Sequence, residues 1–169
     1  PGLGMERESA GLMPSPEWKK QVLKQQWSQG ETLMVAIGQS YTLTTPLQLG
    51  LAYSALVNGG KLYKPYIVSR IQNTEGKVIE DNKPIITDHL DLNPEHVKQV
   101  KEGLYDVVNE PTGTGYITVR SNQVKIGGKS GTATVATFTE DELFRSCEAR
   151  PLKKRSHAWF VGYAPEDKP

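Results

Sequence analysis

Hydrophobic and polar residues along this chain first predict a helix from Thr45 to Asn58. Thr45 is a residue type that caps helices, Pro46 fits the first turn, and Gln48 completes a capping box with Thr45. Apolar side chains then recur at helical spacing, at Leu47, Leu51, Ala55 and Leu56. The pair Gly59-Gly60 ends the helix, because glycine adopts the left-handed turn without steric cost. Since the segment is apolar nearly all round, we expect it to be buried.

A second helix is predicted to begin at Asn93-Pro94, a capping residue followed by a proline suited to the first turn. One apolar stripe runs along it, at Val97, Val100, Leu104 and Val107. The helix stops before Pro111, because the residue before a proline is pushed out of helical geometry. Ser15-Pro16 predicts a shorter helix, and we expect the rest of residues 1–32 to be loop.

Runs rich in β-branched and aromatic residues predict the strands. Leu62–Ile71 and Lys77–Ile79 flank a turn at residues 73–76 and predict a hairpin. Two further runs, residues 124–138 and 157–165, flank a polar excursion and predict an antiparallel pair. The order of helix, hairpin, helix, loop and antiparallel strands indicates an α+β fold rather than repeated βαβ units.

Composition narrows the function classes. The chain has 169 residues, of which 37% are hydrophobic and 23% charged, and this is typical of one folded domain. Its 20 basic and 19 acidic residues give a net charge of +1, so no strong field favours nucleic-acid binding. No apolar run reaches the roughly 18 residues that cross a bilayer. Cys147 is the single cysteine, which excludes an internal disulfide, and no ligand spacing predicts a metal site.

The strongest chemical signal is the stretch from Lys129 to Thr132, within a strand-like run. A fixed cation, a hydroxyl and a glycine on a strand edge can seat a carboxylate beside a reactive carbonyl. Lys129 can hold an anion and tune proton transfers, and Ser130 offers a hydroxyl to a carboxylate. Gly131 has no side chain, so a substrate backbone can lie along the edge as an added strand. Thr132 can offer its backbone N–H to an oxyanion.

The same stretch has two other interpretations, and the first of them, a phosphate-binding loop, fails on two counts. Gly128-Lys129-Ser130 matches the end of a phosphate-binding loop, but Gln123 stands where that motif needs its first glycine. A helix should follow such a loop, whereas residues 132–138 are strand-like. The other interpretation is a turn without function, since such short stretches also occur by chance.

Three blocks, taken in order, resemble class B penicillin-binding proteins, most closely the penicillin-binding protein 2 group of the rod-shape elongation machinery. They are Gly38–Tyr41 with Thr44–Leu49, then Lys129–Ala133, then His157–Pro165. The resemblance covers essentially the whole chain. It implies the α/β three-layer transpeptidase fold shared with serine β-lactamases, an antiparallel sheet with helices on both faces, present here only in part.

By this resemblance the parent protein is a D,D-transpeptidase that cross-links peptidoglycan stem peptides through an acyl-enzyme and binds penicillin. The implied catalytic residues are Lys129, Ser130 and Thr132, and the implied substrate-binding residues are Lys129, Ser130, Gly131, Thr132 and Ala133. Lys129 and Ser130 would bind the terminal carboxylate of D-Ala-D-Ala or of a β-lactam. The backbone of Thr132 would complete the oxyanion hole, and the Thr112–Gly115 loop would lie near the entrance. No cofactor and no metal are implied.

The resemblance also implies a location and partners. The parent protein would lie on the periplasmic face of the bacterial inner membrane, anchored by a segment outside this chain. Its partners would be the rest of its own transpeptidase domain, a lipid-linked-precursor glycosyltransferase and cell-shape scaffold proteins. Nucleic acid is not expected among them.

The chain departs from the family in two elements, S-x-x-K, whose lysine activates the nucleophilic serine, and S-x-N. No serine here has a lysine three residues on, and Ser121-Asn122-Gln123 is not S-x-N. In the family both elements lie upstream, and an edge strand and a closing helix follow. Residues 1–169 are therefore expected to be the C-terminal portion of one transpeptidase domain, inactive alone. Two alternatives remain, a non-catalytic peptidoglycan-binding module and a serine β-lactamase or β-lactam sensor.

Overall fold

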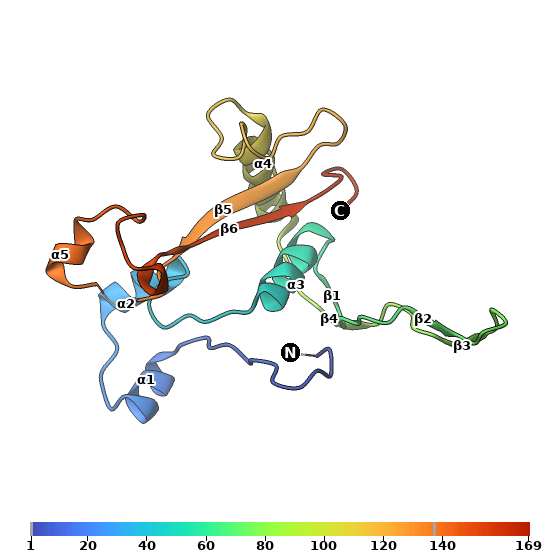
Figure 1. The fold of residues 1–169 in the computed structure, drawn as a ribbon, viewed down its shortest axis with the longest axis horizontal. Helices are drawn as coiled ribbons and strands as arrows, with labels where there is room; N and C mark the ends of the chain where they lie inside the picture. Colours follow the sequence, from blue (N-terminus) through green and yellow to red (C-terminus); the bar gives the residue numbers. More distant parts are fainter. Residues whose placement is uncertain (1, 137) are drawn as a thin grey trace.

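The protein consists of helices and short antiparallel strand pairs (Figure 1). Its structure is a computed structural model that describes residues 2–136 and 138–169. The elements in chain order are α1 (Pro16–Val22), α2 (Gln29–Ala36), α3 (Pro46–Val57), β1 (Lys61–Tyr63), β2 (Arg70–Gln72), β3 (Val78–Asp81), β4 (Ile86–His89), α4 (Pro94–Asn109), β5 (Gly127–Ala133), α5 (Glu140–Leu143), the 3-10 helix η1 (Leu152–Lys154) and β6 (His157–Tyr163). All the named strands pair antiparallel, so the predicted α+β class is confirmed. Within the described residues, no helix has the length and apolar character needed to cross a membrane.

The three predicted helix starts are confirmed by their caps. Ser15 accepts a hydrogen bond from the Trp18 N–H at 3.1 Å, and Thr45 and Gln48 form the expected capping box. Asn93 caps α4 in the same way. The prediction that the rest of residues 1–32 is loop is wrong at residues 29–32, which form the first turn of α2. A capping box of Ser28 with Glu31 starts this helix, and that pair is its signal in the sequence.

The burial expected for α3 is found at only part of its surface. Ala55 and Val57 are buried, whereas the other side chains of the helix are half-buried or exposed. The predicted C-terminal turn is present, with φ of 84° at Gly59 and 92° at Gly60. The Gly60 N–H donates to the Ala55 carbonyl at 2.8 Å, which is the bond of a Schellman motif.

The apolar side of α4 differs from the predicted stripe. The helix packs against β5 and buries Leu104 and Val108, while Val100 is 45% exposed. The buried side follows Val97, Lys101, Leu104 and Val108, and this spacing is as helical as the predicted one. Lys101 is a charged residue within this buried side. The hydrophobic pattern of the sequence therefore predicted the adjoining stripe through Val100 and Val107 instead.

The predicted hairpin is present, but its first strand is divided. β2 pairs with β3 across the expected turn, whereas β1 pairs with β4. Pro65 lies between β1 and β2, where a residue without an N–H cannot extend a ladder. The β2–β3 hairpin extends away from the other elements (Figure 1).

The strand pair β5–β6 runs in unbroken register from Gly127 opposite Tyr163 to Ala133 opposite His157. The predicted run over residues 124–138 was too long, since residues 134–136 are not in a strand and Thr137 lies outside the described residues. α4 packs on β5, and α3 contacts both β6 and α4. Helices from two separate parts of the chain therefore support this strand pair (Figure 1).

Candidate functional site

All five predicted site residues, Lys129 to Ala133, lie on β5 and stand in register with residues of β6. Lys129 and Thr132 are exposed and Ser130 is half-buried. In this register Lys129 lies opposite Val161, Ser130 opposite Phe160 and Gly131 opposite Trp159, so two of the site residues pair with aromatic residues of β6. The strand at this position and the non-helical residues 134–136 after it contradict the phosphate-loop interpretation.

Two buried glycines let aromatic rings of β6 cover the backbone of β5. A Cβ added to Gly127 would lie 2.5 Å from Cζ of Tyr163, and one added to Gly128 would lie 2.5 Å from Cζ of Phe160. Any side chain at either position would collide with a ring. Gly131 differs, because the nearest atom that its added Cβ would meet among the described residues, its two chain neighbours aside, is Trp159 Cβ at 3.8 Å. The strand is therefore tightly covered at its start and open where the site residues lie.

The hydrogen bonds of β5 show which residues face its free edge. Carbonyls of alternate residues accept from side chains outside β6, namely Ile126 from Asn109 Nδ2 at 2.9 Å, Ser130 from Lys129 Nζ at 2.8 Å, and Thr132 from Gln39 Nε2 at 3.2 Å. The Lys125 carbonyl, one residue out of phase, accepts from the N–H of Glu166, just beyond β6. In an antiparallel pair, alternate residues direct their N–H and C=O toward and away from the partner. Ser130 and Thr132 thus direct both backbone groups outward.

Lys129 and Ser130 approach this edge from opposite faces of the strand, because successive strand side chains alternate. The Lys129 ammonium folds back over the edge to donate to the Ser130 carbonyl at 2.8 Å. The Ser130 hydroxyl lies 2.8 Å from the hydroxyl of Thr114, in the loop expected near the entrance. One positive charge and two hydroxyls thus surround the edge, a combination suited to a carboxylate.

Gln39 and Asn109 are edge residues that no pattern in the sequence indicated. Gln39 follows α2 and donates to Thr132, 93 residues away. Asn109 ends α4 and donates to Ile126, 17 residues away. No local pattern reports contacts over such separations. The one sequence signal near Gln39 was its place in the first of the three resembling blocks.

The connection between β5 and β6 is held together by its own charges. Lys154 donates to both carboxylate oxygens of Glu142 at 2.7 Å. This ion pair, with the Thr139 N–H, lowers the pKa of Glu142 to about 2. Arg150 stacks on Phe138, 4.2 Å from the ring centroid, and donates to the Glu142 carbonyl. The polar excursion expected from the sequence is therefore a segment with an ion pair and hydrogen bonds of its own.

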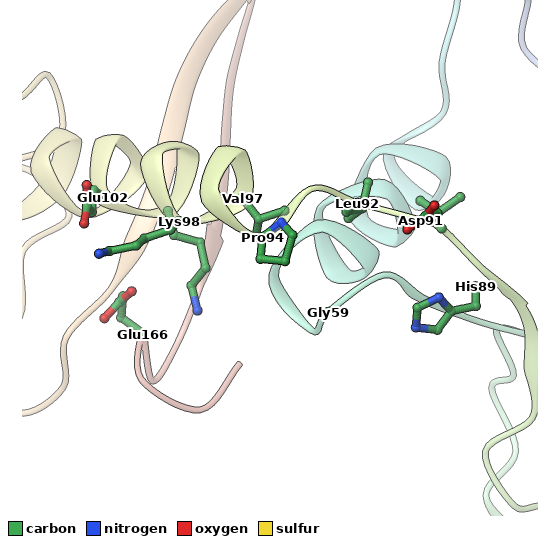
Figure 2. A pocket seen from close by; sticks show the side chains of 11 residues that line it. Gly59, His89, Asp91, Leu92, Pro94, Val97, Lys98, Glu102 and Glu166 are labelled. Carbon is green, nitrogen blue, oxygen red and sulfur yellow. The ribbon is translucent and has the colours of Figure 1, made fainter.

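A pocket of about 520 Å³ lies elsewhere, between the end of α3, the start of α4 and the segment after β6 (Figure 2). Lys98 and Glu102 line it from α4, Glu166 lines it from the segment after β6, and His89 lies at its other end. None of the five predicted site residues contributes to its lining. No group of three potential metal ligands occurs within residues 2–136 and 138–169.

Comparison with known proteins gives matches along the whole chain. The profile of the penicillin binding protein transpeptidase domain matches residues 1–169. The peptidoglycan D,D-transpeptidase MrdA of Haemophilus influenzae is 38% identical over 174 residues, which cover 99% of this chain and 26% of that protein. PBP2 of Pseudomonas aeruginosa, solved with WCK 5153, is 34% identical with a TM-score of 0.72, over 99% of this chain and 34% of its own. PBP2 of Helicobacter pylori, solved in complex with MreC, is 29% identical with a TM-score of 0.72, over 99% of this chain and 28% of its own.

The chain spans between about a quarter and a third of the length of these relatives. The similarity is not confined to the strand pair, because the profile match includes every residue from 1 to 169. The identity of 38% and the TM-scores of 0.72 support the same assignment from sequence and from structure. This chain belongs to the penicillin-binding protein transpeptidase domain family.

Proposed function

We propose that this chain is the C-terminal portion of a peptidoglycan D,D-transpeptidase domain and that β5 is the strand along which the stem peptide binds. The observation that carries the proposal is the outer edge of β5, with which no strand pairs within the described residues. The carbonyls of Ser130 and Thr132 at this edge accept from the side chains of Lys129 and Gln39, and each carbonyl oxygen keeps a second lone pair for a substrate N–H. The S-x-x-K and S-x-N elements would come from the preceding part of the domain. A last edge strand and a closing helix would follow. Family membership and the share of the relatives that the chain covers support this division.

The D-Ala-D-Ala end of the stem peptide would add to β5 as an extra strand, with its terminal carboxylate on the Lys129 ammonium and the Ser130 hydroxyl. The small residues Gly131 and Ala133 leave room for its backbone. Attack by the serine turns the penultimate D-Ala carbonyl into a tetrahedral oxyanion, to which the Thr132 N–H donates. Collapse expels the terminal D-alanine and leaves an acyl-enzyme. An amine of a neighbouring stem peptide then takes the acyl group and frees the serine.

The parent protein would lie on the periplasmic face of the inner membrane, anchored outside this chain. We expect its partners to be a glycosyltransferase that uses lipid-linked precursors and a cell-shape scaffold protein. The Helicobacter pylori relative solved in complex with MreC supports the scaffold partner. The names of the reported relatives favour a transpeptidase over a β-lactamase or a binding module without catalysis.

Acylation of the complete parent protein by a fluorescent penicillin tests this proposal. The unaltered protein should be labelled covalently, and Lys129→Ala should lower the second-order rate constant by roughly 10- to 150-fold. The magnitude follows from about 1.5–3 kcal/mol for a hydrogen bond to a charged group, at tenfold per 1.4 kcal/mol. Lys125→Ala, which removes an exposed lysine just before β5, is the matched control and should leave the rate unchanged.

Equal rates for both variants and the unaltered protein would refute the role of Lys129. Absence of labelling in the unaltered protein would contradict the enzyme itself and favour a binding module. Fast release of hydrolysed drug after labelling would instead identify a β-lactamase.

A further inference from the structure

The side chain of Gln39 joins the N-terminal part of the chain to the free edge of β5. Its amide Nε2 donates to the carbonyl of Thr132 at 3.2 Å. Thr132 is the residue whose N–H is proposed to bind the oxyanion. Within one extended residue the N–H and the C=O point to the same edge, so a donor fixed on the carbonyl also sets the direction of the N–H.

The backbone around Gln39 is shaped to present this side chain. Gly38 has φ of 75° and Ser40 has φ of 66°, so two left-handed residues enclose Gln39 in a tight turn. Such a φ is uncommon at a residue that carries a side chain, as at Ser40, and persists only where the surroundings enforce it. The N–H of Gln39 donates to the Met34 carbonyl at 2.9 Å, which fastens the turn to the end of α2.

The helix that carries this turn is itself anchored at its start. Lys19 is buried on α1 and donates to the Glu31 carboxylate of α2 at 2.5 Å and to the Gln26 carbonyl at 2.9 Å. Glu31 also closes the capping box with Ser28. Two helices joined by an ion pair and a turn with two left-handed residues therefore anchor the backbone of Gln39, and the hydrogen bond to Thr132 holds the far end of its side chain.

We propose that Gln39 is a positioning residue of the transpeptidase site, which holds the outer edge of β5 so that the Thr132 N–H stays aimed at the developing oxyanion. This inference rests on the proposed function. A neutral amide is the suitable group, because it donates to the carbonyl without placing charge beside the oxyanion. An ionised carboxylate of the same size would repel the Thr132 carbonyl oxygen and the nearby oxyanion. Once protonated, it could again donate a hydrogen bond to the Thr132 carbonyl.

The test uses the complete parent protein with Gln39→Glu, Gln39→Met and the control Gln72→Glu, which adds the same charge to the exposed hairpin strand β2. Acylation by a fluorescent penicillin is measured from pH 5 to pH 8, and each rate is divided by that of the unaltered protein at the same pH. We expect Gln39→Glu to be slowed tenfold or more at pH 8 and to recover by about twofold at pH 5, where roughly one-sixth of an ordinary glutamate is protonated. Gln39→Met should be slowed at every pH without recovery, and Gln72→Glu should match the unaltered protein.

The fraction of protein labelled at saturation separates positioning from folding, because loss of folded protein lowers that fraction, whereas a misplaced N–H lowers the rate constant of the molecules that are labelled. The stretching frequency of the acyl-enzyme ester carbonyl gives a second readout. It should rise in Gln39→Met, since a displaced Thr132 N–H polarises that carbonyl less. Normal rates and frequencies in both Gln39 variants, with the unaltered protein acylated, would overturn this inference and leave the proposed function standing. Failure of the unaltered protein to acylate would remove both.

Discussion

Gly128 and Gly131 lie three residues apart on β5, yet the structure predicts opposite responses to the same added methyl group. A Cβ on Gly128 would lie 2.5 Å from Phe160 Cζ and 2.8 Å from the backbone carbonyl oxygen of Val161. The ring could turn aside, but the carbonyl belongs to the ladder, so the strands themselves would have to separate. A Cβ on Gly131 would meet its nearest neighbour at 3.8 Å, an ordinary van der Waals distance.

The magnitude follows from two effects of opposite sign. Overpacking of a filled site costs typically about 1–3 kcal/mol, and this applies to Gly128→Ala only. The lower chain entropy of alanine in the unfolded state returns about 0.4–1 kcal/mol at both positions. The free energy of unfolding of the two variants should therefore differ by about 1–3 kcal/mol, with Gly128→Ala the less stable.

Thermal unfolding of the complete parent protein measures this difference, at roughly 2–4 °C for each kcal/mol in a domain of ordinary size. Gly131→Ala should unfold at a slightly higher temperature than the unaltered protein, because it gains the entropic term without a packing cost. The rate of penicillin acylation, measured on the same samples, should nevertheless be lowered in Gly131→Ala, although this variant is the more stable of the two. Its methyl group would crowd the face of β5 beside the edge where the substrate is proposed to lie. Equal unfolding temperatures for both variants would refute the argument from ring and ladder contacts.

Two local interactions give further predictions. Thr45→Ala removes the cap of α3 and should cost about 1 kcal/mol in denaturant unfolding, while Thr44→Ala beside it should change little. Lys19, 2.5 Å away, and the Ser28 N–H lower the pKa of Glu31 from 4.5 to about 2. Because this pKa is depressed in the folded state, the stabilisation is complete above about pH 5 and is lost as the pH falls toward 2. The unfolding temperature should therefore fall more steeply over that range in the unaltered protein than in Glu31→Gln, and parallel curves would exclude the pair as a source of acid sensitivity.

The helix starts could be predicted from sequence because their chemistry is local. A cap such as Thr45 or Asn93 bonds to N–H groups two or three residues ahead, so the residues that interact are neighbours in the chain. The same reasoning covers the start of α2, where Ser28 and Glu31 carry the signal. Which side of a helix is buried has no such local cause. Val100 and Val108 are equally apolar, and only the placement of β5 buries Val108 and leaves Val100 exposed.

The amino-acid sequence by itself determined the α+β class, the caps, the strand that carries Lys129 to Thr132 and the resemblance to penicillin-binding proteins, because each depends on residues close together in the chain. The tertiary structure decided which edge of that strand is free and which side chains hold it. Gln39 and Thr132 are 93 residues apart, and their hydrogen bond exists only after α2, its strained turn and β5 have been brought together. A hydrogen bond requires two atoms within about 3 Å of each other, and no pattern of neighbouring residues records such an approach between distant segments.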